Sequence, residues 1–168
     1  MEDLEDADIY DNKIFSNIEG ATGYSSGAAA NFINNVTIRQ TTKDILVNVT
    51  SDPFKFVGIN KEDDYTDYTF SIENNVVTSP NTSTFSSRGI VFNNNVIKEG
   101  GIRLSNAQNM TLTNNSITTT TSNAVRIDSG CIDISITDNV FNTLQSCIYQ
   151  NNTDAVNVTI NNNNCLEN

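Results

Sequence analysis

Three side chains whose chemistry suits sugar binding recur at one fixed interval in the second half of the chain. Arg103, Arg126 and Tyr149 are 23 residues apart, and each is the middle residue of a short run that begins with Ile or Val. Guanidinium groups donate hydrogen bonds, and a tyrosine ring presents an apolar face with a polar tip. The residues two places further on are Ser105, Asp128 and Asn151. We therefore expect a glycan-binding face at Arg103, Arg126, Asp128, Tyr149 and Asn151.

The same column of residues has two other interpretations. Arg126 beside Asp128 is the arrangement in this chain nearest to a lyase site, which needs an Arg or Lys base and carboxylates that bind calcium. The pair is equally explained as a surface ion pair worth less than about 1 kcal/mol. The whole column also fits an ordinary solvated or oligomer-facing strand.

Other catalytic chemistry finds little support in the residue types. The chain has no His, which excludes a catalytic triad or a metal site built on histidine. Hydrolysis of a sugar chain needs two carboxylates about 5 to 9.5 Å apart. Asp128 with Asp133, and the cluster Asp63, Asp64 and Asp67, could supply such pairs, but 20 acidic residues produce such pairs by chance. We assign no catalytic residue, metal or cofactor. The residue types favour a protein without enzymatic activity, and the alternative is a polysaccharide lyase or glycoside hydrolase.

The three cysteines, Cys131, Cys147 and Cys165, are odd in number and show no CxxC spacing. This pattern indicates neither a zinc site nor a disulfide framework. Cys165 occupies the place that Ile117 and Phe141 hold in other copies of the repeat described next. We therefore expect the cysteines to be small buried hydrophobic residues.

The elements that position these residues are copies of one repeat. In GIRLSNAQNMTLTNNSIT, residues 101–118, two short alternating runs indicate strands with one buried face. The pattern apolar, x, apolar, x, Asn or Asp, Asn, x, apolar recurs along the chain. Its second Asn, the marker residue, falls at Asn12, Asn35, Asn75, Asn95, Asn115, Asn139 and Asn163.

The marker intervals are 23, 40, 20, 20, 24 and 24 residues. We interpret each repeat as one coil of a solenoid. The interval of 40 then corresponds to two coils, one of which has a degenerate copy of the pattern with its strand in Asp44–Thr50. The intervals predict about seven or eight coils of 20 to 24 residues. The marker Asn suits a turn because it tolerates the left-handed backbone region, and its amide can bond the equivalent amide of the next coil. Its role is structural.

Length and charge bound the remaining organisation. A chain of 168 residues is normally one domain, so we expect one β-helix domain over 1–168, with an acidic tail at 1–8 and a loop insertion at 51–69. A net charge of −11 argues against nucleic acid or an anionic membrane as partner. No apolar run is long enough for a membrane span, and the acidic start does not fit a signal peptide.

The repeats GIRLSNAQNMTLTNNSIT, AVRIDSGCIDISITDNVF and SCIYQNNTDAVNVTINNNNC resemble those of right-handed parallel β-helix proteins, the pectin-lyase-like group. The resemblance covers nearly the whole chain, in framework positions. It implies an all-β right-handed parallel β-helix, most like the modules of phage tailspikes and tail fibres. Members of the group generally bind or act on extended polysaccharides along a lateral face.

The expected function is therefore a structural or host-recognition module of a viral or phage tail spike, fibre or appendage, located in the virion. The alternatives are a polysaccharide lyase, hydrolase or epimerase, and a microbial surface adhesin located at the cell surface or outside the cell. Open sheet edges at both ends of such a coil invite association. The expected partners are further copies, as in a trimer, or other structural proteins that cap the ends, with a host-surface polysaccharide as ligand.

Overall fold

The computed structural model describes residues 69–151 and 154–167 and, before them, the strands at 7–9, 13–16, 23–24, 39–43, 46–49 and 55–57. Side chains are described within 72–151 and 154–166. All elements in this part of the chain are β-strands. Accordingly, no helix there is long and apolar enough to cross a membrane.

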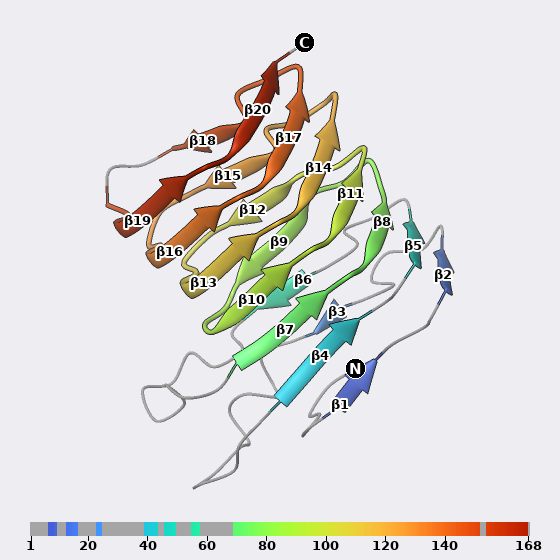
Figure 1. Ribbon diagram of the computed structural model, residues 1–168. Helices are drawn as coiled ribbons and strands as arrows, with labels where there is room; N and C mark the ends of the chain where they lie inside the picture. The colour runs from blue at the N-terminus through green and yellow to red at the C-terminus, as the bar shows by residue number, and fades with distance from the viewer. Residues whose placement is uncertain are drawn as a thin grey trace, which may run out of the picture.

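The strands form three parallel sheets, and each coil of the chain adds one strand to each sheet in turn (Figure 1). Sheet A contains β1 (Ala7–Ile9), β4 (Arg39–Lys43), β7 (Thr69–Glu73), β10 (Ile90–Asn93), β13 (Gln108–Thr113), β16 (Ile132–Thr137) and β19 (Val156–Asn161). Sheet B contains β2 (Lys13–Ser16), β5 (Leu46–Val49), β8 (Val76–Thr78), β11 (Val96–Lys98), β14 (Ser116–Thr119), β17 (Val140–Thr143) and β20 (Asn164–Glu167). Sheet C contains β3 (Gly23–Tyr24), β6 (Lys55–Val57), β9 (Ser83–Ser86), β12 (Ile102–Leu104), β15 (Val125–Ile127) and β18 (Ile148–Gln150).

This arrangement confirms the predicted fold class, an all-β parallel solenoid. The predicted count of seven or eight coils is wrong for the continuously described chain, which makes about four. The strands β1 to β6 pair in register ahead of β7, β8 and β9 in the same three sheets. The marker intervals are regular only from Asn75 onward. The prediction also counts the irregular copies before Asn75, and it therefore overestimates the number of regular coils.

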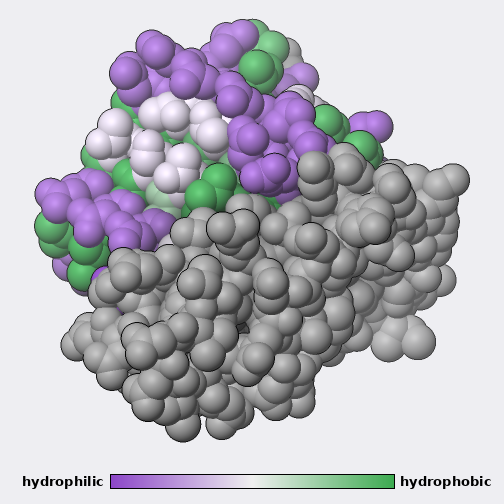
Figure 2. Space-filling model, turned by 60° about the horizontal axis from the view of Figure 1, so that its bottom comes forward, coloured by the Kyte–Doolittle hydropathy of each residue, from purple (hydrophilic) through white to green (hydrophobic). Residues whose placement is uncertain are grey.

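Alternation along each strand builds the core. In β10, Ile90 and Phe92 are fully buried while Val91 and Asn93 are partly exposed. Parallel pairing places Phe92 beside Ile72 and Leu112, so equivalent apolar residues stack from coil to coil. On the face shown in Figure 2, the described surface is mostly hydrophilic or near neutral, and hydrophobic residues occur in small separate groups. The apolar side chains of the described strands therefore lie mainly in the interior of the coil.

The predicted ladder of marker amides is confirmed between Asn75 and Asn163. The side-chain amide of Asn115 donates to Oδ1 of Asn139 at 2.9 Å and to the carbonyl oxygen of Phe92 at 2.9 Å. Oδ1 of Asn115 accepts from the backbone and side-chain nitrogens of Asn95 at 2.9 and 3.1 Å. The side chain thus links three coils inside the core, where unpaired polar groups would be costly.

The left-handed residue at this turn is the one before the marker, which corrects the prediction. Positive φ angles of 53° to 58° occur at Asn74, Asn94, Asn114, Asp138 and Asn162. The marker itself serves the ladder and is buried at Asn75, Asn95, Asn115 and Asn139. The two roles of one Asn are therefore divided between neighbours: the exposed residue turns the chain and the buried one bonds the coils.

The expectation that the cysteines are only buried hydrophobic residues is wrong for two of them. Cys147 and Cys165 form a disulfide whose Cα atoms are 6.0 Å apart. Cys147 directly precedes β18 and Cys165 lies in β20, so the bridge joins sheets C and B at the last coil. Cys165 does align with Phe141, as predicted, and Cys131 is buried in the core with its thiol intact.

Several predicted features fall wholly or partly outside the described residues. Strand β1 includes two residues of the predicted acidic tail, 1–8, and both β6 and Thr69, the first residue of β7, lie inside the predicted loop insertion, 51–69. The rest of both segments lies outside the described residues, as do the acids Asp63, Asp64 and Asp67 and the repeat copy at residues 30–37.

Candidate functional site

Of the residues predicted to form a ligand-binding column, Arg103, Arg126 and Tyr149 lie side by side on sheet C, and Asp128 and Asn151 directly follow its strands β15 and β18. Arg103 pairs in register with Arg126, and Arg126 pairs with Tyr149. The side chains of Arg103 and Arg126 are 49% and 43% exposed, and the guanidinium carbon of Arg126 lies 5.9 Å from the centre of the Tyr149 ring. At this distance the charge and the ring attract each other. Period and alternation were enough to predict this alignment.

Asp128 joins the column into one network. Its side chain is only 7% exposed, and its Oδ2 accepts from Nε of Arg103 at 2.6 Å while its Oδ1 accepts from Nε of Arg126 at 2.8 Å. Oδ1 also accepts from the amide of Asn151 at 3.3 Å, and the hydroxyl of Tyr149 lies 3.2 Å from Oδ1 of Asn151. All five predicted residues are therefore connected by described interactions.

The two arginines keep Asp128 ionised. Burial raises the pKa of a carboxyl group because it removes water from the charged form. The hydrogen bonds from Arg126 and Arg103, together with their charges, outweigh this effect, so the pKa of Asp128 lies below its ordinary value. Asp128 is therefore an anchor for two cations and holds no proton near neutral pH.

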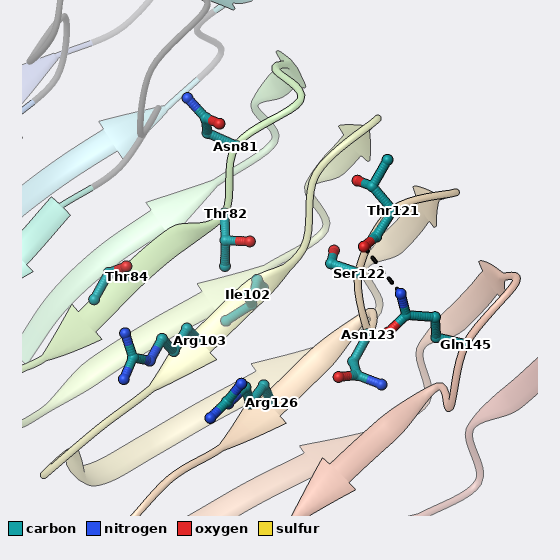
Figure 3. A pocket seen from close by; sticks show the side chains of 10 residues that line it. All are labelled: Asn81, Thr82, Thr84, Ile102, Arg103, Thr121, Ser122, Asn123, Arg126 and Gln145. Carbon is teal, nitrogen blue, oxygen red and sulfur yellow. Dashed lines mark hydrogen bonds between the residues drawn. The ribbon is translucent and has the colours of Figure 1, made fainter.

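An open groove of about 620 Å³ runs beside this network, between the outer face of sheet C and the loops that lead into it from sheet B (Figure 3). Arg103 and Arg126 lie next to each other along one side and lean in the same direction along their strands. The lining residues are Asn81, Thr82, Thr84, Ile102, Arg103, Thr121, Ser122, Asn123, Arg126 and Gln145. The surface of the groove is thus made mostly of hydroxyl, amide and guanidinium groups.

The groove exists because the loops from sheet B to sheet C differ in length. The loop before β12 comprises only residues 99–101, whereas the loop before β15 comprises residues 120–124. A Cβ atom on Gly100 would overlap the carbonyl oxygen of Asn81, and one on Gly101 would overlap that of Asn123. The two glycines therefore let this short loop lie close to the loops of the neighbouring coils, and the space left outside it forms the groove.

The wall made by the longer loops is held by hydrogen bonds. The side-chain amide of Gln145 donates to the carbonyl oxygen of Thr121 at 3.0 Å, and that of Asn123 donates to the carbonyl oxygen of Ser146 at 3.0 Å. The hydroxyl of Thr143 donates to the carbonyl oxygen of Ser122 at 2.9 Å. These bonds connect adjacent coils and fix the wall before any ligand arrives, which lowers the entropy cost of binding.

Sequence reasoning missed the loop side of the groove. The polar run before Ala124 was the available signal, together with the glycine pair in one short loop. The predicted carboxylate partner Asp133 is exposed, adopts a left-handed conformation with φ 56°, and accepts from the amide of Asn157 at 2.8 Å. Among the residues that the structure describes, no group of three or more Cys, Asp and Glu side chains is arranged to hold a metal ion.

No protein-family model, curated protein or solved structure matches the chain. Its function therefore has to be argued from the groove and the network beside it.

Proposed function

We propose that this β-solenoid is a structural or host-recognition module that binds a glycan across sheet C, within a viral appendage such as a phage tail spike or tail fibre. The groove is the observation that carries the proposal. Its lining combines hydroxyl, amide and guanidinium groups, and these exchange hydrogen bonds with sugar hydroxyls. Because the lining loops and strands belong to successive coils, an extended chain can lie across them.

The network beside the groove supports the same proposal. Arg103 and Arg126 line the groove, and Asp128 fixes the direction of both. Tyr149 continues the column one coil further, with 42% of its surface exposed. An aromatic ring at the edge of a polar groove is suited to packing against the apolar face of a sugar ring.

Binding is favoured over hydrolysis at this site. A general acid must carry a proton near the working pH. Both oxygens of Asp128 accept hydrogen bonds from arginines, and its pKa is lowered. The adhesin alternative would use the same groove and would differ in the location of the protein.

The disulfide supports a location outside a reducing cytosol. Disulfides persist in oxidising surroundings such as virion and cell surfaces. We include in the proposal a homo-oligomer such as a trimer, or other structural proteins that cap the coil. Light scattering tests this part: a mass that is a multiple of the chain mass is expected, and a monomer at every concentration would count against it.

The glycan proposal is tested with Thr82→Val combined with Thr84→Val, applied to an array of capsular and cell-wall polysaccharides. Both side chains line the groove, and valine keeps their shape while removing the hydroxyl group. Each lost hydrogen bond costs about 1 kcal/mol, so affinity for the retained glycan should fall by at least about tenfold. Thr111→Val removes a hydroxyl from the outer face of sheet A and is the matched control.

Unchanged retention by the groove variant, or equal loss in the sheet A control, would reject the groove as the glycan site. If no glycan of any kind is retained by the unmodified protein, the proposed function itself fails. Size analysis of the incubated polysaccharides completes the test, because depolymerisation would favour the enzyme alternative.

A further inference from the structure

We propose that the glycan held in the groove is anionic, and that its carboxylate or sulfate groups bind the outward nitrogens of Arg103 and Arg126. This inference rests on the proposed glycan-binding function and adds the charge of the ligand. It rests on the hydrogen bonds that the two guanidinium groups make and on the positive charge at the groove, which the acidic composition of the chain does not predict.

Each guanidinium group uses one edge and leaves another for a ligand. Nε of Arg103 and Nε of Arg126 both donate to Asp128, and the described residues offer neither group another hydrogen-bond acceptor. Four Nη nitrogens therefore remain, two on each arginine, and each arginine is nearly half exposed. Planar guanidinium groups with an unused edge bind carboxylate and sulfate-like oxygens in a two-pronged geometry.

The charges at the site do not cancel. Asp128 needs one cation for neutrality, and it has two, so the network retains one positive charge. The described residues that line the groove include two arginines and neither Asp nor Glu. The chain as a whole carries a net charge of −11. A locally cationic groove in so acidic a protein indicates selection for an anionic group, since hydroxyl and amide groups alone would serve a neutral sugar.

The dimensions favour a polymer over a free ion. The lining residues come from the loop before β9 through to the loop before β18, which is three steps between coils. Successive strands of a sheet are about 4.8 Å apart, so the groove extends about 14 Å along the stack. The two arginines are neighbours within this length, and the remaining hydroxyl and amide groups are available to the sugar hydroxyls.

The test compares one polymer backbone in three charge states: dextran, carboxymethyl dextran and dextran sulfate of equal chain length, titrated by calorimetry. At least one charged form should bind at least about tenfold more tightly than dextran, and Arg103→Gln and Arg126→Gln should each reduce that affinity by about tenfold. Lys98→Gln removes one positive charge from an exposed position of sheet B and should leave the affinity unchanged. Comparison of the two charged forms distinguishes carboxylate from sulfate.

Salt gives a second measurement that needs no variant. Raising the ionic strength from about 0.05 to about 0.5 M should weaken binding of the charged form, because salt screens exposed charges. The proposal is overturned if neither charged form binds, if dextran binds equally well, or if Lys98→Gln lowers affinity as much as the arginine variants. One outcome would reject only this inference and leave the proposed function standing. In that outcome, retention of glycans on the array depends on Thr82 and Thr84, but neutral and charged polymers bind equally well.

Discussion

Asp128 fixes the direction of two guanidinium groups at once. It is nearly buried, and each of its oxygens faces one arginine. The neighbouring amide of Asn151 bonds it as well. An exposed arginine normally samples many rotamers, and a ligand must then supply the free energy to order it. The carboxylate of Asp128 already orders the side chains of Arg103 and Arg126 before a ligand binds.

This role predicts a pH-dependent stability. Because the pKa of Asp128 is lowered in the folded protein, its carboxylate stabilises the fold above the unfolded value, about 4, and this contribution is lost as the pH falls through the lower folded value. Asp128→Asn removes the contribution at every pH. The difference in free energy of unfolding between the two proteins, about 1 kcal/mol near neutral pH, should therefore shrink below about pH 4. Urea unfolding across this range measures it, and a difference that stays constant or grows on acidification contradicts the role.

The turns between sheets A and B show how neighbouring asparagines divide their work. Asn114 is exposed with φ 55°, whereas Asn115 is buried and bonds both neighbouring coils. The sequence cannot assign these roles, because two adjacent asparagines look alike. Burial decides, since only the inward residue can reach the amides above and below it.

Substitutions at this pair should have unequal effects. Asn115→Leu removes the acceptor of the backbone nitrogen of Asn95 and the side-chain donor to the carbonyl oxygen of Phe92, so it should cost about 3 kcal/mol of unfolding free energy. Asn114→Gly keeps the left-handed turn, because glycine adopts it without strain, and should change stability by less than about 1 kcal/mol. Denaturant unfolding of both variants makes the comparison. Equal effects would mean that the buried amide ladder contributes little.

The last coil is held by the disulfide. Strands β19 and β20 each have a neighbouring strand on one side only, and Ile160, whose register partner Ile136 is fully buried, is 47% exposed. The bridge from Cys147 to Cys165 closes a segment of 18 residues in this region. Apolar burial alone therefore secures this coil less well than the coils before it.

Replacing both cysteines, Cys147→Ser with Cys165→Ser, should lower the free energy of unfolding by about 3 kcal/mol, as expected for a closed loop of this length. A reducing agent should lower the denaturation midpoint of the unmodified protein and leave that of the double variant unchanged. A midpoint insensitive to reductant in the unmodified protein would show that the bridge does not form.

Across the whole molecule, features that repeat could be predicted and features that do not repeat could not. The strands and the column of Arg103, Arg126 and Tyr149 follow from alternation and a constant period, because parallel coils stack equivalent residues. The groove depends on the unequal lengths of loops before β12 and β15, and the disulfide depends on which sheets Cys147 and Cys165 reach. Both are relations between coils, for which a periodic pattern gives no signal.

We propose that a glycan lies in the groove between sheet C and the loops that lead into it. The most direct measurement is NMR mapping of backbone amides during titration with a glycan retained on the array. Shifts should concentrate in the loops before β9, β15 and β18 and at Arg103 and Arg126, with little change along the outer face of sheet A. Shifts centred on sheet A or on the last coil, with the groove amides unmoved, would contradict it.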